Sequence, residues 1–353
     1  EISCSLVGSE MCIRDSNMIA RGKSSVEFSK VFLRSSAAIS GPKEKKGPLG
    51  EFFDYSYDDP YCRTENWEQA EIQLQKDAMQ LALKKIGLEF TDIRVVVGGD
   101  LNNQLAITNY ALRDFDVPYL GVYSACSTCT QSIALASMLV DSGYGENILT
   151  ITSSHNSTSE RQFRYPTEYG GQKPNSMTST ATGAGAAIIS NIPSAIKITR
   201  ATIGKIVDPN LSDTQDMGRT MAPAAAMTLK QHLEDFQIEL DEYDLILTGD
   251  LSKYGSEVFI EIMKEFSYTI GGNYDDAGKM LYDIKNQEVF AGGSGCGCIS
   301  LVAMGYVVDC LKKGIYNKVL LIATGALMNP IMVAQNETIP AIAHAVVLER
   351  SNL

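Results

Sequence analysis

The sequence lacks both a long apolar run and an excess of positive charge. No uninterrupted apolar segment reaches the roughly 18 to 20 residues that a membrane-spanning helix needs. Lysine and arginine total 30 against 42 aspartates and glutamates, giving a formal net charge of −12. A nucleic-acid-binding surface requires clustered basic residues, so this balance argues against one. If the protein works at a membrane, we expect it to lie on the membrane surface.

Cysteine is also sparse. Residues 6–16, LVGSEMCIRDS, look like the translated end of a sequencing adapter, so we expect residues 1–16 to be an artefact and Met18 to be the true start. Two of the eight cysteines, Cys4 and Cys12, lie in this segment, which leaves six without regular spacing. That number indicates a reducing compartment rather than a disulfide-stabilised scaffold.

What is present suits a soluble α/β protein with a large core, because 44% of the residues are hydrophobic and 20% are charged. Apolar residues recur at helical spacing over 64–87, and a β-branched strand with a glycine turn follows at 93–104. Helical and strand patterns then alternate as far as residue 190. This alternation predicts βαβ crossovers in a mostly parallel sheet that is covered by helices.

The second half of the chain repeats the first. Gly99-Asp100-Leu101 is echoed by Gly249-Asp250-Leu251, and GYGENILTITSS (143–154) is echoed by GIYNKVLLIATG (314–325). GAGAAIIS (183–190) is echoed near the end by IAHAVVLE (342–349). Three echoes in the same order predict a duplicated, domain-sized unit, with halves at 17–190 and 191–353.

Cys126 lies in YSACSTCT (123–130), where a strand pattern gives way to a helical one. A thiol at a helix N-terminus is near the positive end of the helix dipole, which lowers its pKa and favours the thiolate. A nucleophile also needs a base and donors for an oxyanion. Cys126-x-x-Cys129 and Cys296-x-Cys298 could alternatively meet in a zinc or redox site. We interpret most of these thiols as buried small hydrophobes, and we predict neither a metal nor a cofactor.

Two tandem βαβαβ halves with Cys126 at a helix start resemble the thiolase fold, an α-β-α-β-α sandwich shared by thiolases and ketoacyl-ACP synthases. The closer resemblance is to the stage V sporulation protein AD family of endospore-forming bacteria. It is carried by segments 153–174, 221–225, 290–298 and 339–349, including FRYPTEYG, GGSGCGC and IPAIAHAVVLE, and by ATGALMNP (323–330).

This second resemblance implies binding of dipicolinic acid (pyridine-2,6-dicarboxylate), as the free acid or its calcium chelate, and its uptake into the developing endospore. It also implies membrane-protein partners encoded in the same operon, and a cytoplasmic protein associated peripherally with the forespore or spore inner membrane.

The partners that Cys126 would need for condensation are missing from the matching positions. Enzymes similar to ketoacyl synthase III carry a histidine in the turn after a second-half strand, where this chain has Asp250. They carry an asparagine in the glycine loop that here contains Ser294. Only three histidines are present. We expect His232, in a charged helix, to be at the surface, which leaves His155 and His344.

We therefore expect a binding protein without catalytic residues. The alternative is an acyltransferase or condensing enzyme that uses Cys126 with His155 or His344, and a third hypothesis is a scaffold for membrane partners. Helix N-termini bind carboxylates, arginine and lysine pair with them, and tyrosine stacks on a pyridine ring. The predicted ligand-binding residues are Cys126, His155, Arg164, Tyr165, Tyr169, Lys173, Ser294, Gly295, Cys296 and His344. A homodimer through residues 119–124 is also predicted, because related folds pair two subunits there.

Overall fold

The computed structural model describes residues 18–164 and 169–351. Residues 1–16, predicted to be an artefact, lie outside this range. The first half of the described chain contains β1 (Ile19–Arg21), β2 (Ser25–Glu27), β3 (Phe32–Ser40), α1 (Pro42–Lys45), β4 (Tyr55–Ser56), α2 (Trp67–Lys84), β5 (Val95–Gly99), α3 (Ala106–Leu112), β6 (Tyr119–Gly121), α4 (Thr128–Asp141), β7 (Asn147–Ser154), α5 (Asn156–Phe163), β8 (Ser179–Thr180) and β9 (Gly183–Ser190).

The second half begins with β10 and continues the same alternation of strands and helices. It contains β10 (Ile196–Ile203), α6 (Met217–Phe236), β11 (Leu245–Thr248), α7 (Ser252–Glu265), β12 (Tyr274–Asp276), α8 (Ala277–Met280), β13 (Gly293–Ser294), α9 (Cys296–Leu301), α10 (Val308–Lys313), β14 (Lys318–Ala326), α11 (Pro330–Ala334) and β15 (Ala341–Arg350). A π-helical turn over Val302–Val307 joins α9 to α10, so these segments form one continuous helix.

The strand order is symmetric about the contact between β3 and β10. Outward from that contact, one half reads β3-β9-β7-β5-β6 and the other reads β10-β15-β14-β11-β12. The inner strands of each half pair antiparallel, whereas β5 pairs parallel with β6 and β7, and β11 pairs parallel with β12 and β14. Parallel neighbours require the helical crossovers that the sequence pattern predicts. The prediction of a mostly parallel sheet was wrong, because five of the nine neighbouring pairs in this order are antiparallel.

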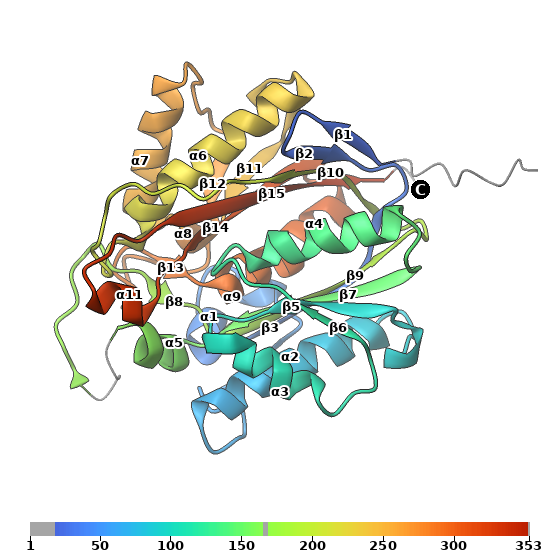
Figure 1. Ribbon diagram of the computed structural model, residues 1–353. Coiled ribbons are helices and arrows are strands. Elements are labelled where there is room, and N and C mark those ends of the chain that lie inside the picture. The colour runs from blue at the N-terminus through green and yellow to red at the C-terminus, as the bar shows by residue number, and fades with distance from the viewer. Residues whose placement is uncertain (1–17, 165–168, 352–353) are drawn as a thin grey trace, which may run out of the picture.

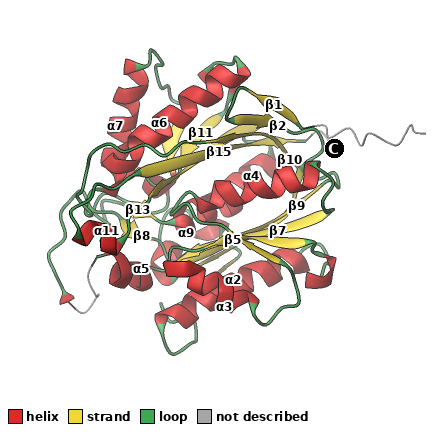
Figure 2. Ribbon diagram, in the orientation of Figure 1, coloured by secondary structure: helices red, strands yellow, loops and turns green. Residues whose placement is uncertain are grey.

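The molecule has five layers (Figure 1). Helices α4 and α9 lie between the two halves of the sheet, and their side chains share one large apolar cluster with both halves. Helices α2 and α3 pack on the outer face of the first half, and α6 and α7 on that of the second (Figure 2). The predicted thiolase-like α-β-α-β-α architecture is confirmed. Within the described residues, no helix is both long and apolar enough to cross a bilayer.

His232 was predicted to lie at the surface, but the structure buries it. Its side chain is fully buried, with Nδ1 2.7 Å from Thr202 Oγ1 and Nε2 2.6 Å from Tyr243 Oη. Burial lowers the pKa of its imidazole to about 3. The surface prediction failed because α6 is covered on this side by β10 and the β1–β2 hairpin, which come from distant parts of the chain.

Candidate functional site

Cys126 lies in a sharp turn just before α4. The preceding residue, Ala125, has a φ of 51°, a left-handed conformation that is uncommon for a residue with a side chain. The thiol is buried, and its pKa is raised well above the ordinary value by burial, by the negative charge of Asp250 and by a hydrogen bond to that carboxylate. This is the opposite of the direction expected from the helix dipole, because desolvation and the carboxylate outweigh it.

Asp250 occupies the turn in which the sequence comparison looked for a histidine. Its Oδ2 accepts the Gly295 N–H at 2.9 Å and the Ser294 hydroxyl at 3.1 Å, and its Oδ1 accepts the Thr324 hydroxyl at 2.5 Å. Burial raises the pKa of this carboxyl. Sequence reasoning noted only that histidine was absent here. It did not consider that the aspartate at this position could itself contact Cys126. In the structure, the Asp250 carboxyl is hydrogen-bonded to the Cys126 thiol.

The glycine loop before α9 packs directly against the first half of the molecule. Gly295 has a φ of 98°, and a Cβ there would lie 2.6 Å from the Ser154 hydroxyl, so no larger residue fits. The Ser154 hydroxyl also accepts the Gly297 N–H at 3.0 Å. The Gly295 N–H, which we had predicted to bind a ligand carboxylate, is therefore occupied by the protein's own Asp250.

Cys126 and Cys296 come together at the interface of the two halves. They share a small apolar cluster with Leu101 and Ala125, and the Cys296 thiol points to the Ala125 carbonyl at 3.6 Å. Each of the six cysteines in the described part of the chain is a free, buried thiol. Cys296 is fully buried behind Cys126 and does not line the cavity described next.

A small cavity of about 30 Å³ lies beside Cys126. Three of the predicted ligand-binding residues line it, namely Cys126, Arg164 and Ser294. The rest of its wall is mostly apolar or aromatic and consists of Leu101, Tyr123, Ala125, Ser159, Phe163, Thr180, Met217, Ala326 and Met328. Among the described residues, the aromatic side chains at the cavity are Tyr123 and Phe163, which the sequence analysis did not select.

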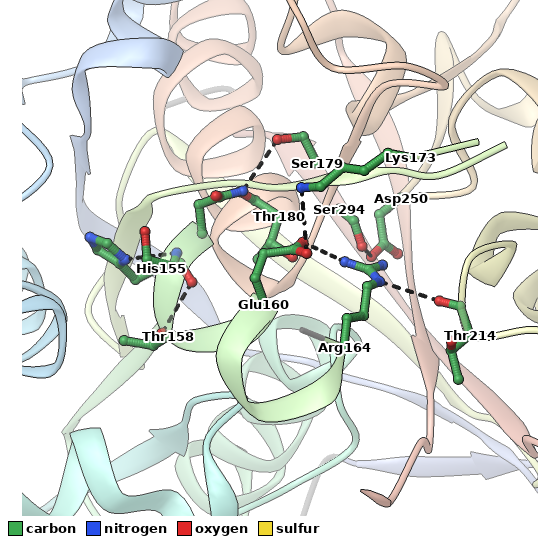
Figure 3. A network of polar contacts seen from close by, with 12 residues as sticks. His155, Thr158, Glu160, Arg164, Lys173, Ser179, Thr180, Thr214, Asp250 and Ser294 are labelled. Carbon is green, nitrogen blue, oxygen red and sulfur yellow. Dashed lines mark hydrogen bonds and ion pairs between the residues drawn. The ribbon is translucent and has the colours of Figure 1, made fainter. Parts of the chain in front are cut away.

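Arg164 brings a positive charge into this cavity (Figure 3). Its side chain is only 2% exposed, its Nη1 lies 2.6 Å from Glu160 Oε1, and its Nε donates to the Thr214 carbonyl at 3.3 Å. The buried Nη2 has no hydrogen-bond partner among the described residues. Lys173 lies 3.5 Å from the other oxygen of Glu160 but is 40% exposed. Glu160 is the counter-ion that sequence reasoning missed.

His155 and His344 do not line the cavity. His155 is the N-cap of α5: its Nδ1 accepts the Ser157 N–H at 3.2 Å, and its Nε2 lies 2.8 Å from the Pro60 carbonyl. His344 Nδ1 accepts the Gly204 N–H at 3.1 Å. Burial lowers the pKa of both rings, to about 4 for His344. The structure thus gives His155 a capping role in place of the predicted pocket role.

Of the two tyrosines predicted to stack on a ligand, Tyr165 lies outside the described residues. Tyr169 is described and is 70% exposed, and it is not among the residues that line the cavity.

Comparisons with solved structures agree with this architecture. The chain matches a crystallised variant of OleA from Xanthomonas campestris with a TM-score of 0.59 and 12% identity, covering 92% of this chain and 99% of that one. It matches 3-oxoacyl-[acyl-carrier-protein] synthase III from Aquifex aeolicus with a TM-score of 0.55 and 13% identity, covering 90% and 99%. At such low identity, these matches establish the thiolase-like fold alone.

Comparisons with related sequences identify the family more specifically than the fold does. The chain is 50% identical over 321 residues to stage V sporulation protein AD of Bacillus subtilis (strain 168), covering 91% of this chain and 95% of that protein. The family description "Stage V sporulation protein AD" matches residues 22–349. The chain therefore belongs to the stage V sporulation protein AD family.

Proposed function

We propose that this sporulation protein binds dipicolinate without catalysis, in the cavity beside Cys126, and takes part in the uptake of dipicolinate into the developing endospore. The ligand is a planar dicarboxylate, taken up as the free dianion or as its calcium chelate. Such a molecule needs a cation and hydrogen-bond donors for its carboxylates, and an apolar or aromatic wall for its ring.

The observation that carries the proposal is the unpartnered Nη2 of Arg164. Only 2% of the Arg164 side chain is exposed, and its Nη2 has no hydrogen-bond partner among the described residues. A buried arginine normally satisfies all of its N–H groups, because leaving one unpaired is unfavourable. Here Glu160 pairs with Nη1 and the Thr214 carbonyl accepts from Nε, which leaves Nη2 without a partner on a residue that lines the cavity. A ligand carboxylate bound there would satisfy it.

The cavity must widen before a pyridine ring can enter. Its volume is about 30 Å³, whereas pockets that hold small-molecule ligands measure about 300 to 1,000 Å³. The wall includes Met217, Met328 and Phe163. Methionine has three rotatable bonds and repacks easily. We therefore expect ligand binding to move these side chains, and Phe163 and Tyr123 to contact the ring.

The site also lacks the features that acyl transfer requires. The thiol has a raised pKa, its hydrogen-bond partner is an acid, and the Gly295 N–H is held by that acid. An oxyanion formed at Cys126 would meet the carboxylate of Asp250, where an acyl-transfer enzyme places hydrogen-bond donors. The acyltransferase alternative predicts a covalent adduct on Cys126 after incubation with an acyl-CoA, which intact mass spectrometry would detect.

Calorimetric titration with dipicolinate, with and without calcium, tests the proposal. A charge-assisted hydrogen bond contributes about 1.5 to 3 kcal/mol, so Arg164→Gln should weaken binding by about 10- to 100-fold. Arg161→Gln is the matched control, because Arg161 lies one turn earlier, is 48% exposed and pairs with Glu68. It should bind as the unchanged protein does. A flat titration, or equal losses in both variants, would contradict the proposal.

We further propose that the protein acts at the inner membrane of the forespore or spore beside membrane proteins of the same operon, and that it forms a homodimer through β6. This strand is one edge of the sheet, and Leu120 in the strand and Tyr123 just after it are exposed. Leu120→Glu should give a monomer by light scattering if this edge is the interface. Co-purification of those membrane proteins with the full chain tests the first part, and their failure to co-purify would contradict it.

A further inference from the structure

A buried acid without a counter-ion lies directly behind the polar wall of the cavity. Asp250 is fully buried, and no ion pair joins it to a cation among the residues the structure describes. It does not itself line the cavity, but Ser294 and Cys126 do, and both are hydrogen-bonded to it. Asp250 is therefore hydrogen-bonded to two of the polar residues that line the cavity.

The titratable groups that face Asp250 from neighbouring elements are all acids. Cys126 faces it from the turn before α4, Cys298 from α9, and Asp276 from the N-terminus of α8. Arg164, the cation of the cavity, is already paired with Glu160. A dianionic ligand would therefore enter a cavity whose lining cation is already neutralised by Glu160 and whose wall is backed by the carboxylate of Asp250. Like charges in such a place repel strongly at low dielectric.

The direction of the hydrogen bond from Ser294 adds to the repulsion between the site and an anionic ligand. An ionised carboxylate can only accept, so the Ser294 hydroxyl must donate its one proton to Asp250 Oδ2, 3.1 Å away. The hydroxyl then offers only lone pairs to the cavity. Toward a ligand carboxylate, which also has only lone pairs, this arrangement is repulsive.

We infer that Asp250 takes up a proton when an anionic ligand binds, and that this proton turns the Ser294 hydroxyl into a donor toward the ligand. The proton comes from solvent and adds to Oδ2, which then donates to Ser294 Oγ while its other lone pair still accepts the Gly295 N–H. Ser294 in turn donates to the ligand carboxylate, next to Arg164. The inference rests on the proposed function and makes Asp250 a positioning residue for carboxylate ligands.

Proton uptake is measured by titrating the protein with dipicolinate in buffers of different ionisation enthalpy between pH 6 and 9, where the ligand carboxylates are ionised. We expect uptake to approach one proton per ligand. The Kd should rise about tenfold per pH unit above the pH at which Asp250 ionises in the free protein. The Asp250→Asn variant should bind with a Kd independent of pH and without proton uptake.

Two further variants separate this role from a structural one. Ser294→Ala should bind the ligand more weakly and lose most of the pH dependence of the Kd. The variant lacks the hydroxyl through which the protonation of Asp250 acts on the ligand carboxylate. Thr324→Val removes a donor to Asp250 Oδ1 and should shift the pH midpoint upward. Asp276→Asn is the control, since Asp276 is equally buried but bonds Thr248 and the N–H groups of Leu251 and Ser252, and no residue of the cavity wall. Its proton count should match that of the unchanged protein.

The outcomes distinguish the two proposals. Absence of any binding contradicts the proposed function itself. Binding with no proton exchange and a flat pH profile overturns the role of Asp250 but leaves the binding site intact. Proton uptake that persists in Asp250→Asn, or that disappears in Asp276→Asn, assigns the proton to another group and overturns the inference as well. The buffer series on the unchanged protein decides the first point even if the Asp250 variant does not fold.

Discussion

The thiol of Cys126 should react slowly with an alkylating agent, and its reactivity should rise when Asp250 loses its charge. Only the thiolate reacts, and an ordinary cysteine with a pKa of about 8.5 is about 3% thiolate at pH 7. Because the pKa of Cys126 lies well above the ordinary value, its thiolate fraction at pH 7 is smaller still. We expect iodoacetamide to modify it at least about tenfold more slowly than free cysteine.

The Asp250→Asn substitution isolates the contribution of the carboxylate. Two of the three causes that raise the thiol pKa are the charge and the hydrogen bond of Asp250, and only burial remains in the variant. A neighbouring like charge shifts a pKa by about one to three units, so the alkylation rate should rise by at least about tenfold. The comparison is made over a series of pH values, because the rates of the two proteins should diverge as Asp250 ionises in the unchanged protein.

The assay is peptide mass spectrometry of the alkylated protein at timed intervals, with Cys126→Ser to assign the adduct. Cys129 is a matched internal control, because it is also buried and its pKa is raised to about 12, but Asp250 is not among the causes. Its rate should not change in the variant. Alkylation of Cys126 as fast as free cysteine at pH 7, or equal rates with and without Asp250, would refute the reasoning.

Four other predictions rest on single contacts. Replacing Glu160 with Gln leaves Arg164 buried without its counter-ion and should lower the free energy of unfolding by about 3 to 5 kcal/mol in denaturant titrations; a loss under 1 kcal/mol, as for an exposed pair, would contradict it. The same variant should gain more stability from dipicolinate than the unchanged protein, because the ligand supplies the missing charge. Gly295→Ala should disrupt folding, since its Cβ meets Ser154 at a left-handed φ, and a folded variant by circular dichroism would argue against that contact. His344 is buried with a pKa of about 4, so its contribution to stability is present above the unfolded pKa of about 6.5 and is lost as the pH falls toward 4. Denaturant titrations of His344→Asn should therefore lose stability less steeply between pH 6.5 and 4, and a parallel profile would contradict this.

The architecture could be predicted from the sequence because its helices and strands are indicated by the local spacing of apolar residues. Helix α2 is marked by apolar spacing and ends before Gly87, and the strands read as short apolar runs at the predicted places. The repeat then fixes the arrangement of two halves. His232 shows the limit of local patterns: its neighbours in sequence are charged, but the β1–β2 hairpin and β10 cover it from elsewhere in the chain.

The candidate site was predicted only in part, for the same reason. Arg164 was found because an arginine near an aromatic segment signals anion binding, and the structure places it at the cavity. Glu160, one turn earlier on α5, was missed because an i,i+4 pair on a short helix reads as a surface ion pair. His155 was given a pocket role because the end of its strand should face the pocket, but its ring turns to cap α5.

Asp100 and Asp250 show why a repeat cannot tell which copy forms the site. Both follow a glycine at the end of a buried strand, and both are buried. Asp100 is satisfied within its own half, by Thr108 and the Asn102 N–H. Asp250 reaches across, because the turn before α4 brings Cys126 from the other half onto it. The local motif is the same in both, and only the packing of α4 between the two sheet halves gives Asp250 a hydrogen bond to Cys126, a residue of the cavity wall.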